Sequence, residues 1–258
     1  MNRILIIVTC LLSGISTTLF AQHARFAHEG VIEFERSINT YALLQKQVTA
    51  ENSTYMTPYI ERYKKTEPQF KILKSTLTFS KNKTLFEPVK EESTSTSLWG
   101  EDPETMQNNI VFIDFGTRLQ TTQKKVYEET FLVKDSVRSI NWKITSETRE
   151  IAGYSCRRAN AIILDSIYVV AFYTDEIPVS GGPESFTGLP GMILGVALPH
   201  ENVSWFAKIV NDRTIAATVL VPPTKGKPTD NKGLLAILQK AFKSWGKYAK
   251  STFKALSL

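Results

Sequence analysis

From residue 109 onward the chain is a succession of short segments with the residue pattern of β-strands. Turn residues separate them, for example at Asp135-Ser136 and at Asn211-Asp212. Short consecutive strands with turns at this spacing pair with their sequence neighbours. The pattern therefore predicts a mainly β fold (α+β class), a single antiparallel meander curled as a half-barrel or open barrel. The expected strands are Ile110–Phe115, Gln120–Lys124, Val126–Val133, Ser139–Thr145, Gly153–Leu164, Ser166–Tyr173, Met192–Leu198, Val203–Val210 and Thr214–Val221.

The N-terminal part is expected to add strands and a helical insert. Val31–Ile38 alternates as a strand, and Phe70–Ser80 with Thr84–Val89 is typical of a hairpin. Thr40–Lys65 lacks this alternation and has apolar residues at helical spacing, interrupted by Pro58. We expect one or two helices there.

The C-terminal segment has a different pattern. From Leu234 to Leu256 apolar residues recur every three or four positions, which predicts an amphipathic helix. Its lysines form a basic stripe between the apolar residues, at Lys240, Lys243, Lys247, Lys250 and Lys254. Three interpretations remain open: a helix packed on the sheet, contact with an anionic membrane surface, and capping of an open barrel mouth. The expected domains are residues 22–222, the β-rich domain, and 223–258, a linker and this helix.

The first residues are typical of a secretory signal peptide. Arg3 is followed by an apolar stretch from Ile4 to about Ile15, too short to span a bilayer, and then by the small residue Ala21. Cys10 lies inside the apolar stretch, so a lipoprotein signal is not indicated. We expect residues 1–21 to be removed and the remaining chain to be exported, to the periplasm or the cell exterior.

The positive charge of the chain lies at its C-terminal end. The formal net charge is +6, and from Pro222 onward there are eight lysines and one acidic residue. The rest is therefore nearly neutral, which argues against a nucleic-acid-binding body, because such a body needs a basic face.

Two glycine- and proline-rich knots lie between apolar runs, at Glu176–Pro183 and at Gly188–Met192. Proline fixes φ and glycine allows positive φ, so these knots predict a tight, non-repeating backbone path. One interpretation is a rigid ligand cleft, with Phe186, Leu189 and Met192 as an apolar lip over the concave face of the sheet. The other is a corner that turns the chain and locks two strands.

The same region resembles the signature of the GLPGLI proteins. The matching pieces are Ile-Ala-Gly-Tyr-Ser-Cys-Arg-Arg-Ala at 151–159, Val-Ala-Phe-Tyr-Thr-Asp-Glu-Ile-Pro-Val-Ser-Gly-Gly-Pro at 170–183 and Phe-Thr-Gly-Leu-Pro-Gly-Met-Ile-Leu at 186–194. Phe172 stands where the family commonly has tryptophan, and Met192 where it has leucine. The candidate ligand-binding or motif residues are Tyr154, Cys156, Phe172, Pro178, Pro183, Phe186, Gly188, Leu189, Pro190, Gly191 and Met192.

The resemblance implies a secreted protein of Bacteroidota-type bacteria, often associated with outer-membrane TonB-dependent transport. It also implies a β-rich domain similar to the half-barrel of periplasmic lipoprotein carriers. The family has no established activity, so the resemblance supplies no catalytic residues.

The residues that support catalysis are few. Cys156 is the one cysteine left after signal removal. It is a buried apolar residue, a reactive thiol beside Arg157 and Arg158, or one half of an intermolecular disulfide. The histidines, His23, His28 and His200, have no zinc-site spacing. We expect no catalytic constellation, no metal and no cofactor.

Three functions remain as hypotheses. The first is a non-enzymatic carrier for an apolar or amphipathic ligand. The second is an accessory protein that contacts an outer-membrane transporter through its basic helix and the acidic loop Lys90–Asn108. The third is a thiol enzyme that uses Cys156.

Overall fold

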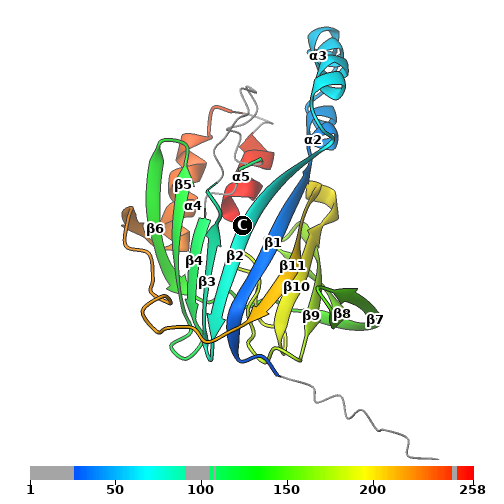
Figure 1. Cartoon of the computed structure of the whole chain (residues 1–258). Coiled ribbons are helices and arrows are strands. Elements are labelled where there is room, and N and C mark those ends of the chain that lie inside the picture. The colour runs from blue at the N-terminus through cyan, green and yellow to red at the C-terminus, as the bar shows by residue number, and fades with distance from the viewer. Residues whose placement is uncertain (1–25, 91–104, 107–108, 246–248) are drawn as a thin grey trace, which may run out of the picture.

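The computed structural model describes residues 26–90, 105–106, 109–245 and 249–258 (Figure 1). The expected signal peptide and almost all of the loop Lys90–Asn108 lie outside these residues. None of the helices in the described part has the length and apolar character needed to cross a membrane.

The described residues form one sheet of twelve strands in the order β12-β6-β5-β4-β3-β2-β1-β11-β10-β9-β8-β7. Every pairing is antiparallel except that of β12 with β6, so the sheet is mixed. The strands are β1 Glu29–Asn39, β2 Phe70–Ser80, β3 Lys83–Pro88, β4 Asn109–Asp114, β5 Leu119–Val126, β6 Glu129–Ser136, β7 Lys143–Ile151, β8 Tyr154–Ile163, β9 Ile167–Thr174, β10 Met192–Leu198, β11 Val203–Asp212 and β12 Lys227–Thr229.

The prediction of a single meander is wrong, because β1 separates two meanders. Strands β2 to β6 follow one another on one side of β1, and β11 back to β7 on the other. Strand β1 pairs with both β2 and β11, and its inward residues Ile32, Phe34 and Ile38 are fully buried. Strands β7 and β12 remain the edges, so the sheet is not closed into a barrel.

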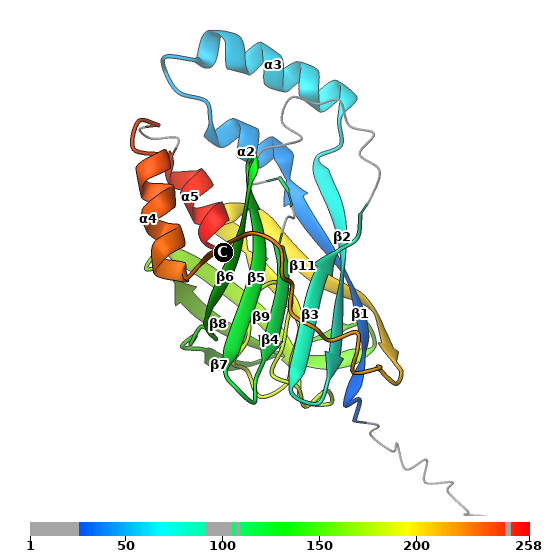
Figure 2. The ribbon, with the colours of Figure 1, turned by 90° about the vertical axis from the view of Figure 1, so that its left-hand side faces the viewer.

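The strands on either side of β1 form two wings of the sheet, β2–β6 with β12 on one side and β7–β11 on the other. The sheet bends so that these two wings face each other (Figures 1 and 2). Pairing registers shift between Glu33 and Phe34 and between Ile193 and Gly195, and such bulges bend strands. One core cluster unites residues of both wings, for example Phe86 of β3 with Val169 of β9. The concave side therefore holds the main hydrophobic core.

Several segments differ from the sequence prediction. The predicted strand Ser139–Thr145 is irregular up to residue 142, and β7 runs from Lys143 to Ile151 instead. The predicted strand Val126–Val133 crosses the turn at residues 127–128 between β5 and β6.

Thr214–Val221 is not a strand: it is irregular, and Leu220 packs with Leu85 and Phe112 in a small cluster of its own. The predicted linker after residue 222 contributes β12, which pairs in parallel with β6. The sequence pattern fails for residues 214–221 because a single buried leucine gives no periodicity. It fails for β12 because a three-residue edge strand is too short to show alternation.

Helices α2 (Thr40–Lys46) and α3 (Ser53–Thr66) project beyond the ends of β1 and β2 (Figures 1 and 2). Pro58 lies inside α3, so the break between the helices is not at this proline but at residues 47–52. Asn52 stabilises that break, because its Nδ2 donates to the Gln47 carbonyl at 2.8 Å and its Oδ1 accepts from the Thr49 amide at 2.7 Å.

The C-terminal segment contains two helices, α4 (Asn231–Ala241) and α5 (Ala249–Ser257), where the sequence indicates one. Asp230 caps α4, with its Oδ1 accepting from the Gly233 amide at 2.7 Å. Both helices lie beside β5 and β6 (Figure 2). Their apolar residues form a second cluster with these strands, made of Val126, Phe131, Val133, Leu234, Leu238, Phe242 and Leu256. A short 3₁₀ turn, η1 (Pro199–Glu201), connects β10 to β11.

We predict that Leu238→Ala lowers the free energy of unfolding by about 3 kcal/mol, because the side chain is buried between α4 and the sheet. The matched control is its neighbour Ile237, which is 43% exposed and is expected to cost at most about 0.5 kcal/mol when changed to alanine. Urea unfolding followed by circular dichroism measures both. Equal, small losses would show that α4 does not stabilise the sheet.

Candidate functional site

The glycine- and proline-rich segment is the loop between β9 and β10, and it runs through the core. Phe186, Leu189 and Met192 are fully buried in the main cluster, with the Phe186 ring 6.0 Å from the Trp205 ring. These three residues therefore fill part of the space between the wings. They do not form an exposed lip.

Backbone hydrogen bonds fix this loop against its flanking strands. The Met192 amide donates to the Ile177 carbonyl at 3.0 Å, and the Ile193 amide donates to the Gly181 carbonyl at 2.8 Å. Trp142 Nε1 donates to the Thr187 carbonyl at 2.8 Å. The loop backbone needs small residues here, because a Cβ at Gly182 would lie 2.6 Å from the Phe186 carbonyl oxygen.

The structure separates the residues singled out by the sequence. Seven are buried, Tyr154 is half-buried, and three lie exposed at turns of the loop. The buried seven are Cys156, Phe172, Pro183, Phe186, Leu189, Gly191 and Met192, and the exposed three are Pro178, Gly188 and Pro190.

Cys156 is fully buried, and its Sγ lies 3.5 Å from the Tyr154 carbonyl oxygen. Desolvation, with the charge of Glu176, raises the pKa of this thiol to about 12. Because the thiolate is the reactive form, this burial opposes nucleophilic chemistry at Cys156.

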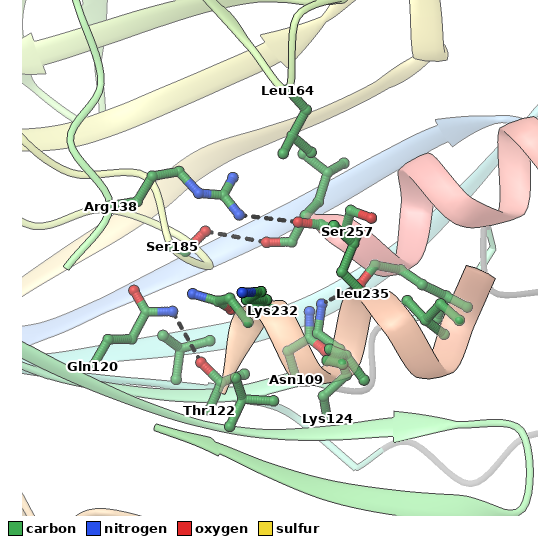
Figure 3. Close-up of a pocket in the computed structure, with 17 residues that line it drawn as sticks. Asn109, Gln120, Thr122, Lys124, Arg138, Leu164, Ser185, Lys232, Leu235 and Ser257 are labelled. Atoms are coloured by element: carbon green, nitrogen blue, oxygen red, sulfur yellow. Dashed lines mark hydrogen bonds between the residues drawn. The ribbon is translucent and has the colours of Figure 1, made fainter. Parts of the chain in front are cut away.

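A cavity of about 300 Å³ lies between the concave face of β4–β6 and the C-terminal helices (Figure 3). Strands β4, β5 and β6 line one wall, and α4 and the end of α5 line the other. The apolar lining residues are Val111, Val133, Leu164, Leu234, Leu235, Leu238, Leu256 and Leu258. None of the eleven residues singled out by the sequence lines it; the nearest part of the motif loop is Ser185.

One end of the cavity is polar and holds the main-chain oxygens of three successive residues, Leu256, Ser257 and Leu258. Lys124 Nζ donates to the Leu256 carbonyl at 2.8 Å, and Arg138 donates to the Ser257 carbonyl at 3.0 Å. Ser185 Oγ donates to the main-chain oxygen of Leu258 at 3.1 Å (Figure 3). Side chains from three separate segments therefore meet at one point.

The charged groups at this end are withdrawn from water. Desolvation lowers the pKa of Lys124 to about 8, with Glu184 opposing the shift and Arg138 adding to it. Desolvation also lowers the pKa of Arg138 and raises that of the buried Glu184. Glu184 Oε2 accepts from Asn109 Nδ2 at 2.8 Å, and its backbone has a positive φ of 52°.

A smaller hollow adjoins the cavity. It shares Asn109, Lys124, Leu256 and Leu258 with the cavity, and it is also lined by Arg36, Glu184 and Trp205. The guanidinium of Arg36 lies over the Trp205 ring, 5.0 Å from its centroid, and donates to the Met106 carbonyl.

The structure describes three side chains of the basic stripe. Lys240 and Lys243 are exposed, whereas Lys254 donates to Glu201 at 2.9 Å. Lys247 and the side chain of Lys250 lie outside the described residues.

The polar residues of the cavity carry no distinct signal in the sequence. Strand β5 reads Leu-Gln-Thr-Thr-Gln-Lys-Lys-Val and is polar on both faces, so its alternation does not show that Lys124 points inward. Arg138 lies in an irregular segment, where no periodicity applies.

Within the described residues, no group of three His, Cys, Asp or Glu side chains is arranged to hold a metal ion. The polar end of the cavity instead presents nitrogen donors on Lys124 and Arg138, which suit an anion or a carbonyl oxygen. It also presents an acceptor, because Gln120 Oε1 is buried without a hydrogen-bond partner among the described residues.

The comparisons with known proteins are consistent with this fold and assign no activity. Residues 163–195 match a family model described as a protein of unknown function (Porph_ging), a Bacteroidota-associated domain. The match spans β9, the motif loop and the start of β10, and it does not confirm the GLPGLI assignment. No curated protein matches the chain.

Two solved structures of PNGF-II, in space groups P21 and C2, are similar in fold. The P21 structure has 15% identity and a TM-score of 0.50, and the match covers 83% of this chain and 34% of that chain. For the C2 structure the identity is 13%, the TM-score is 0.50, and the coverage is 88% and 33%. The chain thus spans about a third of the length of PNGF-II, and at this identity the likeness concerns the fold alone.

We predict that Gly191→Ala lowers the free energy of unfolding by about 3 kcal/mol or more. Gly191 has a φ of 147°, and a Cβ there would overlap the Thr174 carbonyl. Gly153 is the control: its φ is 83°, but a Cβ would meet nothing within 4 Å, so Gly153→Ala costs about 1 kcal/mol of backbone strain. Thermal unfolding compares them. Equal losses would mean that the loop has room to relax.

Proposed function

We propose that this protein binds and carries a small amphipathic ligand and performs no chemistry on it. The observation that carries the proposal is the cavity of about 300 Å³ between the concave sheet face and the C-terminal helices. Ligand sites are typically of roughly 300–1,000 Å³, mostly apolar, with a few polar groups that fix orientation. This cavity has that composition.

The arrangement of the lining supports an elongated ligand with one polar end. Leucines of α4 and valines of β4 and β6 supply an apolar wall, while Lys124 and Arg138 lie at the polar end. The motif loop contributes indirectly: it fills the core beside the cavity and places Glu184 and Ser185 at the polar end.

We also propose that the protein acts after export, on the basis of the signal-peptide pattern of residues 1–21. Fractionation of the host cells tests this. The protein is expected in the periplasm or the medium at a mass that corresponds to cleavage after Ala21, and a full-length cytoplasmic protein would contradict it.

An accessory role through surface contacts is the second candidate. It is favoured by the projecting α2–α3 unit, on which Tyr55 is 65% exposed (Figure 1). A photo-crosslinking residue at position 55 is expected to capture an outer-membrane transporter under this alternative. A buried control position, Ile60, captures none.

We predict that Leu235→Trp reduces ligand binding at least roughly tenfold, equivalent to about 1.4 kcal/mol. Leu235 lines the cavity and is 37% exposed, so the larger ring enters the cavity without displacing core residues. Fluorescence of the neutral apolar probe N-phenyl-1-naphthylamine measures binding. Ile237→Trp is the control, on the same helix but away from the cavity, and it is expected to bind the probe as the unmodified protein does. No binding by the unmodified protein, or equal effects of the two variants, would contradict the proposal.

A further inference from the structure

At the polar end of the cavity a buried lysine and a half-buried arginine hold neutral backbone groups. Lys124 and Arg138 each donate to a backbone carbonyl near the end of α5, at 2.8 Å and 3.0 Å. A carbonyl oxygen satisfies a hydrogen bond but does not neutralise a charge. A charge-assisted bond to an anion is about twice as strong as a neutral one.

Three cations lie at this end, Arg36, Lys124 and Arg138. The carboxylates beside them are Glu184 and the terminal group of Leu258, so positive charge is in excess. Glu184 is the carboxylate whose charge acts on Lys124, and burial raises its own pKa. Arg138 adds a second positive charge beside Lys124. Burying charges without a counter-ion is costly, so this end of the cavity favours an incoming negative charge.

A second observation points to the same place. Trp205 is 2% exposed and lines the adjoining hollow with Lys124, yet its Nε1 has no hydrogen-bond partner among the described residues. An indole N–H is a donor only, and a buried donor without a partner costs free energy. An acceptor atom that entered the hollow within reach of this N–H would satisfy it.

Taken with the apolar wall, these groups define the ligand class. We infer that the cavity takes an alkyl carboxylate, whose anionic head lies between Lys124 and Arg138 and whose chain lies along the apolar wall of β4, β6 and α4. This inference rests on the proposed function and adds the head group. The head replaces the carbonyls of α5 as the partner of the two cations, so the end of α5 shifts when the ligand enters.

A competition experiment with two ligands that differ only in their head group distinguishes recognition of the carboxylate from binding of the alkyl chain. Decanoate and decanol, which share their alkyl chain, each displace N-phenyl-1-naphthylamine from the full protein near pH 7. Decanoate is expected to bind at least roughly tenfold more tightly. In Lys124→Met and Arg138→Met this preference falls to about threefold or less, while the affinity for decanol is unchanged. Lys134→Met, which changes an exposed lysine of β6 away from the cavity, keeps the preference.

The pH dependence supplies a test that needs no change of fold. Above about 8 Lys124 loses its proton, so the affinity for decanoate falls between pH 7 and 9, whereas that for decanol does not. Glu184 also faces Lys124, and its ionisation would act in the same direction. The two are distinguished because Lys124→Met abolishes the dependence only if Lys124 is its source.

The outcomes separate the two claims. Equal binding of decanoate and decanol, or a preference that survives in both cation variants, overturns the carboxylate inference and leaves the carrier proposal standing. Failure of the neutral probe and of both ligands to bind overturns the carrier proposal itself.

Discussion

The pairing of β1 on both of its edges is the interaction on which the rest of the structure depends. It joins the meander β2–β6 to the meander β7–β11, because β2 and β11 pair with β1 and not with each other. The buried face of β1 carries Ile32, Phe34 and Ile38 at the bottom of the concave side. Because the wings bend towards each other around this strand, residues from both wings pack together in one buried core.

That interior is divided between two uses. The loop between β9 and β10 fills one part with Phe186, Leu189 and Met192, and this part is ordinary close-packed core. The C-terminal helices cover the remaining part over β5 and β6, where packing is incomplete and the cavity remains. The signature motif and the candidate binding site are thus neighbours with different roles: the motif shapes the interior, and the helices enclose the site.

Much of the fold could be predicted from local pattern. Phe70–Ser80 and Met192–Leu198 are strands with the expected bounds. Their alternating or continuous apolar residues are the ones that become buried, so the pattern shows where each strand begins and ends. Thr214–Val221 was expected to be a strand and is not, because its one buried leucine packs without ladder pairing. The place of β1 between two distant strands is a long-range pairing that no local pattern contains.

By itself the sequence determined the mainly β character, the positions of most strands and the unusual backbone of the motif loop, since these follow from periodicity and from the conformations of glycine and proline. Only the tertiary structure decided which face of β5 points inward, and that Lys124, Arg138, Ser185 and residues 256–258 meet. These residues lie far apart in the chain, and their meeting depends on the curvature of the sheet and the docking of α5. A period of two residues fixes that side chains alternate, but the side that becomes the interior is fixed by what packs against it.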